Sequence, residues 1–370
     1  MVDLGTEVDV KQAESLAKGQ REWIPLLDAI RGLAVLGVVM THAYGASWIS
    51  DRYDKAGFSG FAQVVGTAVL WIPILFWLSG FVIMMVMQPY FDAKRSLWSF
   101  FQRRMIRITP TWWFGIAFSL AVSASTAALH HQNPRGMSPI EWLTNLTYTP
   151  FIFKQYTEVG VGWTLFIEVQ LYLAVIAIVY IVKRFATNNI HGVLAAVLML
   201  TGLASVFFGN RLDTGIWFTS SWAWFALGSV NYLASYKLTG AWYPVVLAAG
   251  MLVTQPWPAL THLSVLTILI LIAITIAFHP AIGQRHFKLG KSLTFLGDIS
   301  YPYYLLHMPF VRHSNLFATV FERLHLPFWL AYPVVVLLPM AFAYIAKRWL
   351  DRVDKFLMSK LFPRKVASGK

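Results

Sequence analysis

Long apolar stretches recur along the chain, and short polar segments separate them. Their lengths are close to the ~17–25 residues with which an α-helix crosses a bilayer. The pattern predicts ten spans, at about 26–47, 64–87, 110–129, 162–182, 190–208, 216–236, 241–257, 262–279, 292–311 and 327–346. The two spans between 241 and 279 are short and flank a proline-rich turn, so their ends are the least defined. The predicted fold class is therefore an all-α polytopic integral membrane protein.

The positions of lysine and arginine orient these spans. With the N-terminus in the cytoplasm, 22 Lys and Arg residues fall in cytoplasmic segments and seven in outside segments. Cytoplasmic loops of membrane proteins carry the excess of positive charge. Both termini are therefore predicted to be cytoplasmic, with a tail over 1–25, a membrane domain over 26–346 and a basic tail over 347–370.

Composition supports a membrane protein and narrows its chemistry. Of the 370 residues, 57% are hydrophobic and 13% are charged, and the mean hydropathy is +0.57. Membrane topology accounts for the net charge of +13, so no nucleic-acid partner is expected. The chain has no cysteine, which excludes disulfides and a thiol nucleophile. The sequence carries no metal-ligand motif, so no metal is expected either.

The first predicted span carries three ionisable residues, Asp28, Arg31 and His42. Arg31 and His42 are eleven residues apart, which is close to three helical turns, so they share a face about 16 Å apart along the axis. Ionisable groups inside a bilayer are costly and usually face a cavity or a partner helix. Each residue alone could be an interfacial anchor or a hydrogen-bonded core histidine. The three together on one face favour a functional site.

Two further stretches carry polar or small residues. Ser79 and Gly80 in the second span allow two helices to approach closely, which is a common structural feature of membrane helices. Arg103, Arg104 and Arg107 on the cytoplasmic side are three and four residues apart, so a helical turn presents them as a cluster. Arginine forks match phosphate oxygens, so a phosphorylated ligand fits, although ordinary positive-inside anchoring explains the cluster when it is taken alone.

The fourth predicted span contains a carboxylate. Glu168 follows Trp163 by five residues and lies in a helix that is otherwise largely apolar. A carboxylate at membrane depth needs a partner, and Arg31 or His42 could supply one. A functional role is favoured over a structural one.

The ninth predicted span contains a second histidine at membrane depth. Ser300 and His307 are seven residues apart and share a face, with Tyr304 beside them. Pro302 can kink the helix and free a carbonyl group. A histidine held structurally by a tyrosine and a catalytic histidine are equally compatible with this pattern.

Together these stretches resemble the membrane acyltransferase family 3, the bacterial O-antigen acetylase-like group. The resemblance spans about residues 25–346. The matching motifs, in order, are Arg31-x10-His42 within LDAIRGLAVLGVVMTHA, LSGF at 78–81, Arg104-x-x-Arg107, WTLFIEVQLYL at 163–173 and SYPYYLLH at 300–307. Larger members carry an extra C-terminal hydrolase-like domain, and the 24-residue tail predicted here is too short to form one.

The resemblance implies transfer of an acyl group, usually acetyl, from cytoplasmic acyl-coenzyme A to a hydroxyl. The implied acceptor is a sugar of a surface or exported polysaccharide, which could be lipid-linked, and the implied location is the bacterial cytoplasmic membrane. The functional core that it implies is Arg31, His42, Arg104, Arg107 and Glu168. The supporting residues expected around this core are Asp28, Ser79, Trp163, Ser300, Tyr304 and His307.

The chemistry of acyl transfer suits these residue types. A histidine such as His42 has the pKa needed to activate an alcohol near neutral pH, and Glu168 could orient or balance it. Arg104 and Arg107, with Arg103 beside them, suit the coenzyme's phosphates at the inner mouth. Arg31 is expected to lie between these arginines and His42, where it suits either the pantetheine channel or the developing oxyanion. Direct transfer and transfer through an acyl-histidine both remain open.

Other functions remain open as alternatives. The same chemistry could acylate a small secreted metabolite or a lipooligosaccharide. A secondary transporter could use the buried His, Arg and Glu as a proton relay, although no repeat relates the two halves of the chain and the arginine cluster argues mildly against it. A non-catalytic scaffold would leave the polar constellations unexplained. Acceptor, acyl group and oligomeric state are not fixed by the sequence.

Overall fold

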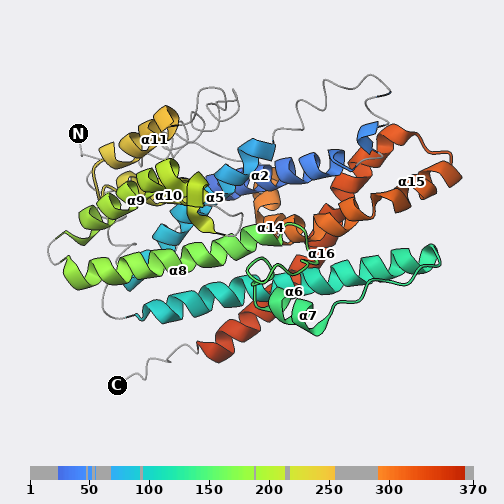
Figure 1. The fold of residues 1–370 in the computed structure, drawn as a ribbon, viewed down its shortest axis with the longest axis horizontal. Helices are drawn as coiled ribbons and strands as arrows, with labels where there is room; N and C mark the ends of the chain where they lie inside the picture. The colour runs from blue at the N-terminus through green and yellow to red at the C-terminus, as the bar shows by residue number, and fades with distance from the viewer. Residues whose placement is uncertain are drawn as a thin grey trace. The chain divides into compact units, whose positions relative to one another are not determined.

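The structure is a computed structural model that describes residues 24–46, 49–51, 55, 68–91, 95–186, 189–212, 217–254 and 291–362. Within these residues its regular elements are all helices, with no β-strand (Figure 1). Six of its helices are long and apolar enough to cross a membrane. They are α2 (Pro25–Tyr44), α5 (Ala68–Met87), α6 (Leu97–Leu129), α8 (Gly162–Phe185), α9 (Ile190–Leu212) and α16 (Ala331–Leu361). The predicted all-helical class is confirmed, whereas the number of ten spans and their orientation stay predictions.

Three more of the predicted spans coincide with helices that are shorter or more polar. They are α10 (Trp222–Ser235), α11 (Trp242–Thr254) and α14 (Lys291–Arg312). The predicted span at 262–279 lies outside the described residues. The remaining helices are α7 (Pro139–Leu146), α15 (Ser314–Arg323) and the short 3₁₀ turns η1 (Gln88–Tyr90), η2 (Phe218–Ser220) and η3 (Phe328–Leu330).

Two helices extend beyond the spans predicted for them. α6 begins at Leu97 rather than near 110, so it includes the arginine cluster, and it continues through Pro110. α16 continues to Leu361, so most of the predicted C-terminal tail is helical. Both extensions are rich in charged residues. An apolar pattern therefore stops short of them, although charged residues such as Lys, Arg and Glu are good helix formers.

The chain forms two compact units. The first comprises residues 1–28, 73–101 and 170–290, and the second comprises 29–72, 102–169 and 291–370. Asp28 and Ser79 fall in the first unit, and the other predicted site residues fall in the second. The candidate site is therefore built by the second unit.

In the first unit, α5 and α10 cross at two glycines. A Cβ atom on Gly80 would run into the Phe225 carbonyl group, and one on Gly228 would run into the Trp77 carbonyl group. The Ser229 hydroxyl donates a hydrogen bond to the Gly80 carbonyl oxygen at 3.2 Å. Such small-residue contacts are typical of helix crossings in membranes. They give Gly80, one of the predicted pair of small residues, a packing role.

In the second unit, α2 and α14 cross at Gly32. A Cβ atom there would lie 2.6 Å from the Gly297 nitrogen and 2.7 Å from the Leu296 carbonyl carbon. Ten residues further along each helix, His42 is hydrogen-bonded to His307. Because the second contact lies ten residues after the first on both helices, α2 and α14 run in the same direction over about 15 Å. In the predicted topology, the first and ninth spans, which correspond to α2 and α14, likewise cross the membrane in the same direction.

The helix α16 packs against both members of this pair. The Tyr303 hydroxyl of α14 donates to the Val336 carbonyl oxygen at 2.9 Å. The Tyr332 hydroxyl of α16 donates to the Met40 carbonyl oxygen of α2 at 3.1 Å. Because Met40 is two residues before His42, α16 fixes the backbone that carries this histidine.

Candidate active site

The centre of the candidate site is a pair of histidines. Nδ1 of His42 lies 3.0 Å from Nε2 of His307. The ring planes differ by 15° and the ring centroids are 5.2 Å apart. Since the two nitrogens are much closer than the centroids, they point toward one another, as in a hydrogen bond that lies in the ring planes. His307 is fully buried, with 0% of its surface exposed, and His42 is partly buried.

Two polar groups of α8 and α14 extend this pair. Nδ1 of His307 lies 2.7 Å from the carbonyl oxygen of Tyr304, one turn earlier in α14. The Tyr304 hydroxyl shares a hydrogen bond of 2.9 Å with the Thr164 hydroxyl in the first turn of α8. The predicted residues His42, His307 and Tyr304 are therefore brought together, and Thr164 joins them.

Glu168 lies one turn after Thr164 on α8. The spacing of four residues places both on one helix face. Its carboxylate interacts electrostatically with the hydroxyl groups of Tyr304 and Tyr148. Tyr148 follows α7, and its hydroxyl donates to the Thr109 hydroxyl at 3.0 Å. Burial raises the pKa of Tyr148, the Thr109 bond opposes this, and the Glu168 charge raises it further, so this phenol stays protonated at neutral pH.

This arrangement combines the groups that acyl transfer to a hydroxyl requires. A neutral imidazole can take a proton from an alcohol. Hydroxyl donors such as those of Thr164 and Tyr304 can stabilise negative charge on an oxygen. The carboxylate of Glu168 acts electrostatically on the Tyr304 hydroxyl. A buried setting strengthens each of these interactions because it excludes water.

Other predicted residues of the second unit lie around this centre. Arg31 is half-buried on α2, three turns before His42. The Ser300 hydroxyl donates to the Gly297 carbonyl oxygen at 2.7 Å, so it is satisfied within α14. Trp163 occupies the first turn of α8, directly before Thr164 in the sequence.

The three arginines of α6 lie on neighbouring turns of one helix but in different surroundings. Arg103 stacks on the ring of Phe362 at 3.8 Å, beyond the end of α16. Arg104 is buried, with 9% of its surface exposed. Arg107 is exposed, and its charge acts on Asp354 of α16. The helix turns each guanidinium toward different surroundings, which spacing alone does not show.

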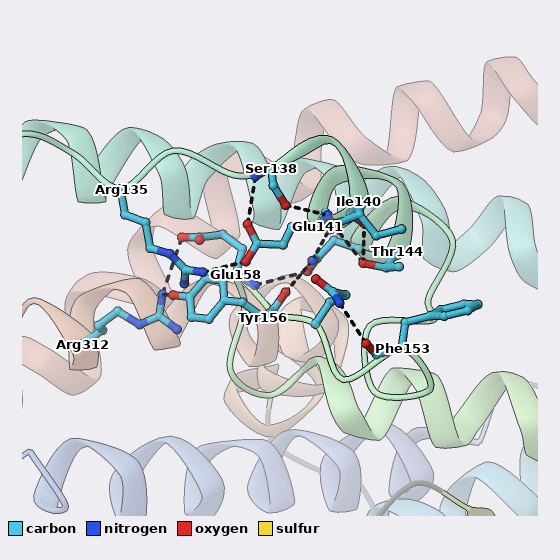
Figure 2. A network of polar contacts seen from close by, with 11 residues as sticks. Arg135, Ser138, Ile140, Glu141, Thr144, Phe153, Tyr156, Glu158 and Arg312 are labelled. Carbon is cyan, nitrogen blue, oxygen red and sulfur yellow. Dashed lines mark hydrogen bonds and ion pairs between the residues drawn. The ribbon is translucent and has the colours of Figure 1, made fainter.

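A polar cluster of Arg135, Glu141, Tyr156, Glu158 and Arg312 holds the segment between α6 and α8 (Figure 2). Arg312, at the end of α14, donates to the Tyr156 hydroxyl at 2.7 Å and lies 3.5 Å from the buried Glu158. Arg135 lies 3.6 Å from the centre of the Tyr156 ring and pairs with Glu141 at 2.6 Å. Arg312 follows His307 by five residues, so this cluster ties the segment to the helix that carries His307.

The short helix α7 is fixed within the same segment. Ser138 and Glu141 form a reciprocal capping box at its start. The Asn145 side chain donates to the Tyr156 carbonyl oxygen at 2.7 Å, and the Trp112 indole of α6 donates to the Asn145 carbonyl oxygen at 2.7 Å. This loop therefore contains a short helix, and its polar side faces the protein.

We expect Arg312→Ala to destabilise the second unit more than Arg135→Ala. Arg312 faces a buried carboxylate, Glu158, and losing a hydrogen bond to a charged group costs about 1.5–3 kcal/mol. Arg135 has a side chain that is 55% exposed, so its loss costs at most about 1 kcal/mol. Thermal unfolding of both variants in the same detergent measures the difference. Equal and small losses would show that the cluster does not hold the segment.

Sequence reasoning did not identify Thr164 or Tyr148, nor the contact between the two histidines. Thr164 stands between two residues that were noted, and a spacing of four residues before Glu168 could have marked it. Tyr148 has a positive φ of 62° in a loop, where no periodicity applies. The contact between His42 and His307 joins residues 265 positions apart.

Comparisons with known proteins agree with this chemistry. A family model described as an acyltransferase domain, Acyl_transf_3, matches residues 24–348. Proteins named O-acetyltransferase OatA from Staphylococcus aureus strains NCTC 8325 and COL are 24% identical over 376 aligned positions. The alignment covers 93% of this chain and 58% of those relatives, so this chain spans less than two thirds of their length. No solved structure gives a significant match.

Proposed function

Because the chain belongs to the acyltransferase family 3, we propose that it is an integral membrane O-acyltransferase. It moves an acyl group, most simply acetyl, from cytoplasmic acyl-coenzyme A to a hydroxyl group of a sugar in a surface or exported polysaccharide. The relatives named O-acetyltransferases support both acetyl as the transferred group and oxygen as the acceptor atom. The bacterial cytoplasmic membrane is the proposed location.

The observation that carries this proposal is the hydrogen-bonded pair of His42 and His307 beside the hydroxyl groups of Tyr304 and Thr164. In the proposed reaction, His42 accepts the proton of the acceptor hydroxyl as its oxygen attacks the thioester carbonyl carbon. The carbon–sulfur bond then breaks, and the coenzyme thiolate takes the proton back from the imidazolium ring. The Tyr304 and Thr164 hydroxyl groups, which are hydrogen-bonded to each other, are the proposed donors to the oxyanion.

In this proposal, Arg31 and the arginines of α6 bind the donor, acyl-coenzyme A. Arg31 lies about 16 Å before His42 on the same helix face, which suits the path of the pantetheine arm. Arg104 and Arg107 are three residues apart near the predicted cytoplasmic side, which suits the phosphate groups. Arg103 is engaged with Phe362 and is given a supporting role.

A thiol assay tests the proposed function directly. The chain has no cysteine, so free thiol released from acetyl-coenzyme A can be measured without background from the protein. Purified protein is given acetyl-coenzyme A with polysaccharide fragments, simple sugars or a hydroxylated small metabolite. We expect thiol release that depends on a hydroxyl acceptor and matches the ester formed. A transporter would instead be supported if the folded protein released no thiol with any of these acceptor compounds, but carried one of them into liposomes that contain the protein.

We expect Arg104→Ala and Arg107→Ala to weaken donor binding, each by about 1.5–3 kcal/mol, the range for hydrogen bonds to charged groups. Lysine at either position should restore only part of the affinity, because it lacks the planar fork. Binding of acetyl-coenzyme A to purified variants measures this. Arg135→Ala is the matched control, because Arg135 is predicted to lie on the outer side of the membrane, away from the first turns of α6. Unchanged affinity in the double alanine variant would remove both arginines from the donor site.

A further inference from the structure

The hydrogen bonds around His307 fix the positions of its protons. Nδ1 of His307 lies 2.7 Å from the Tyr304 carbonyl oxygen. A carbonyl oxygen can only accept a hydrogen bond, so Nδ1 must carry a hydrogen. In a neutral imidazole the other nitrogen then carries none and can only accept. Nε2 of His307, which faces His42, is therefore an acceptor.

The same logic passes to His42. Its Nδ1 lies 3.0 Å from Nε2 of His307 and must donate to it. Neutral His42 is then left with an unprotonated Nε2. We propose that His307 is a positioning residue that holds His42 in its Nδ1-protonated form, so that Nε2 of His42 is the atom that accepts the acceptor's proton. This inference rests on the proposed function, in which His42 is the general base.

The surrounding structure keeps the chain of hydrogen bonds in register. The Gly32 crossing sets α2 against α14 ten residues before the two histidines. Thr164 holds the side chain of Tyr304, the residue whose carbonyl group begins the chain. That carbonyl group cannot take up a proton, so His307 keeps its Nδ1 hydrogen during the reaction. A proton gained by His42 therefore stays on the histidine pair, from which the coenzyme thiolate can accept it when it leaves.

Three variants of His307 separate its two hydrogen bonds. A glutamine amide occupies about the position of Nε2, so His307→Gln keeps an oxygen that can accept from His42. An asparagine amide occupies about the position of Nδ1, so His307→Asn keeps only the bond to Tyr304. His307→Leu keeps neither. Because a wrong tautomer can cost up to about 10⁴-fold in other enzymes, we expect kcat to fall at least about 10²-fold in the Asn and Leu variants. His307→Gln should stay within about tenfold of the native protein.

Nitrogen NMR of protein labelled with ¹⁵N-histidine reads the tautomer without any turnover. The chain has ten histidines, and the signals that disappear in His42→Gln identify His42. We expect an unprotonated Nε2 and a protonated Nδ1 on His42 in the native protein and in His307→Gln. His307→Leu should show a mixture of both tautomers. If the proposed function is wrong, the native protein will transfer no acyl group, whichever tautomer His42 adopts.

Either of two results would overturn the positioning role. One is a protonated Nε2 on His42 in the native protein. The other is equal kcat in folded His307→Gln and His307→Leu. If His307→Leu does not fold, the spectrum of the native protein still decides the question.

Discussion

Replacement of His42 by alanine or glutamine is expected to reduce turnover by about 10²–10⁴-fold, the usual cost of removing a general base. His42 is the member of the histidine pair that is partly exposed, whereas His307 is fully buried. We therefore propose that the acceptor meets His42 rather than His307. Acyl transfer by purified variants at matched amounts of folded protein measures the loss, while binding of acetyl-coenzyme A should be unchanged.

His130→Ala is the matched control for this experiment. His130 follows α6 and is exposed, so its loss should leave turnover unchanged. A His42→Ala protein that keeps more than about a tenth of native turnover would place the base elsewhere, because even a weak general base contributes more than that. His307 would then be the residue to test as the base.

Gly32→Ala is expected to reduce both turnover and stability, although alanine normally stabilises a helix interior over glycine by about 1 kcal/mol. The added Cβ atom would lie 2.6 Å from a backbone nitrogen of α14, and backbone atoms cannot rotate away. The two helices must therefore shift, and overpacking of this kind costs about 1–3 kcal/mol. A shift of about 1 Å at a catalytic pair can reduce turnover about 10²-fold.

The sign of the stability change makes this experiment decisive. Gly136→Ala is the control, because a Cβ atom at Gly136 would meet nothing within 4 Å. Thermal unfolding and turnover are measured for both variants. A Gly32→Ala protein that is more stable than the native protein and fully active would show that the α2–α14 crossing does not set the histidine pair.

Hydropathy predicts most of the helices because a bilayer imposes apolar length on each span. α8 and α9 follow their predicted spans closely. The pattern fails where apolar character is not required, as in the first turns of α6 and the last turns of α16. α14 was predicted despite Asp298 and His307 within it, because its charged residues are few.

The candidate site was predictable in its residue types but not in its contacts. His42, Glu168, Tyr304 and His307 were identified because polar groups at membrane depth are costly and need a reason to be there. Which of them touch depends on the register of α2 against α14. That register is set by Gly32 against the backbone near Gly297, a tertiary contact with no signature in either helix alone.

The arginine cluster and the outer segment illustrate the same limit. Spacing correctly placed Arg103, Arg104 and Arg107 on one helix but could not show that Phe362 covers the first and that the second is buried. The contacts of Arg312 with Tyr156 and Glu158 join residues more than 150 positions apart. Sequence periodicity carries no information at that separation.

The most direct test of the central claim is the molar balance between free thiol and acylated hydroxyl in one reaction. Native protein and His42→Gln protein are reconstituted in lipid and given acetyl-coenzyme A with a hydroxyl acceptor. We expect equal molar amounts of thiol and ester from the native protein, and about 10²–10⁴-fold slower formation of both products by His42→Gln, although it still binds the donor. Formation of both products by His42→Gln at more than about a tenth of the native rate would contradict the assignment of His42 as the base at the centre of this site.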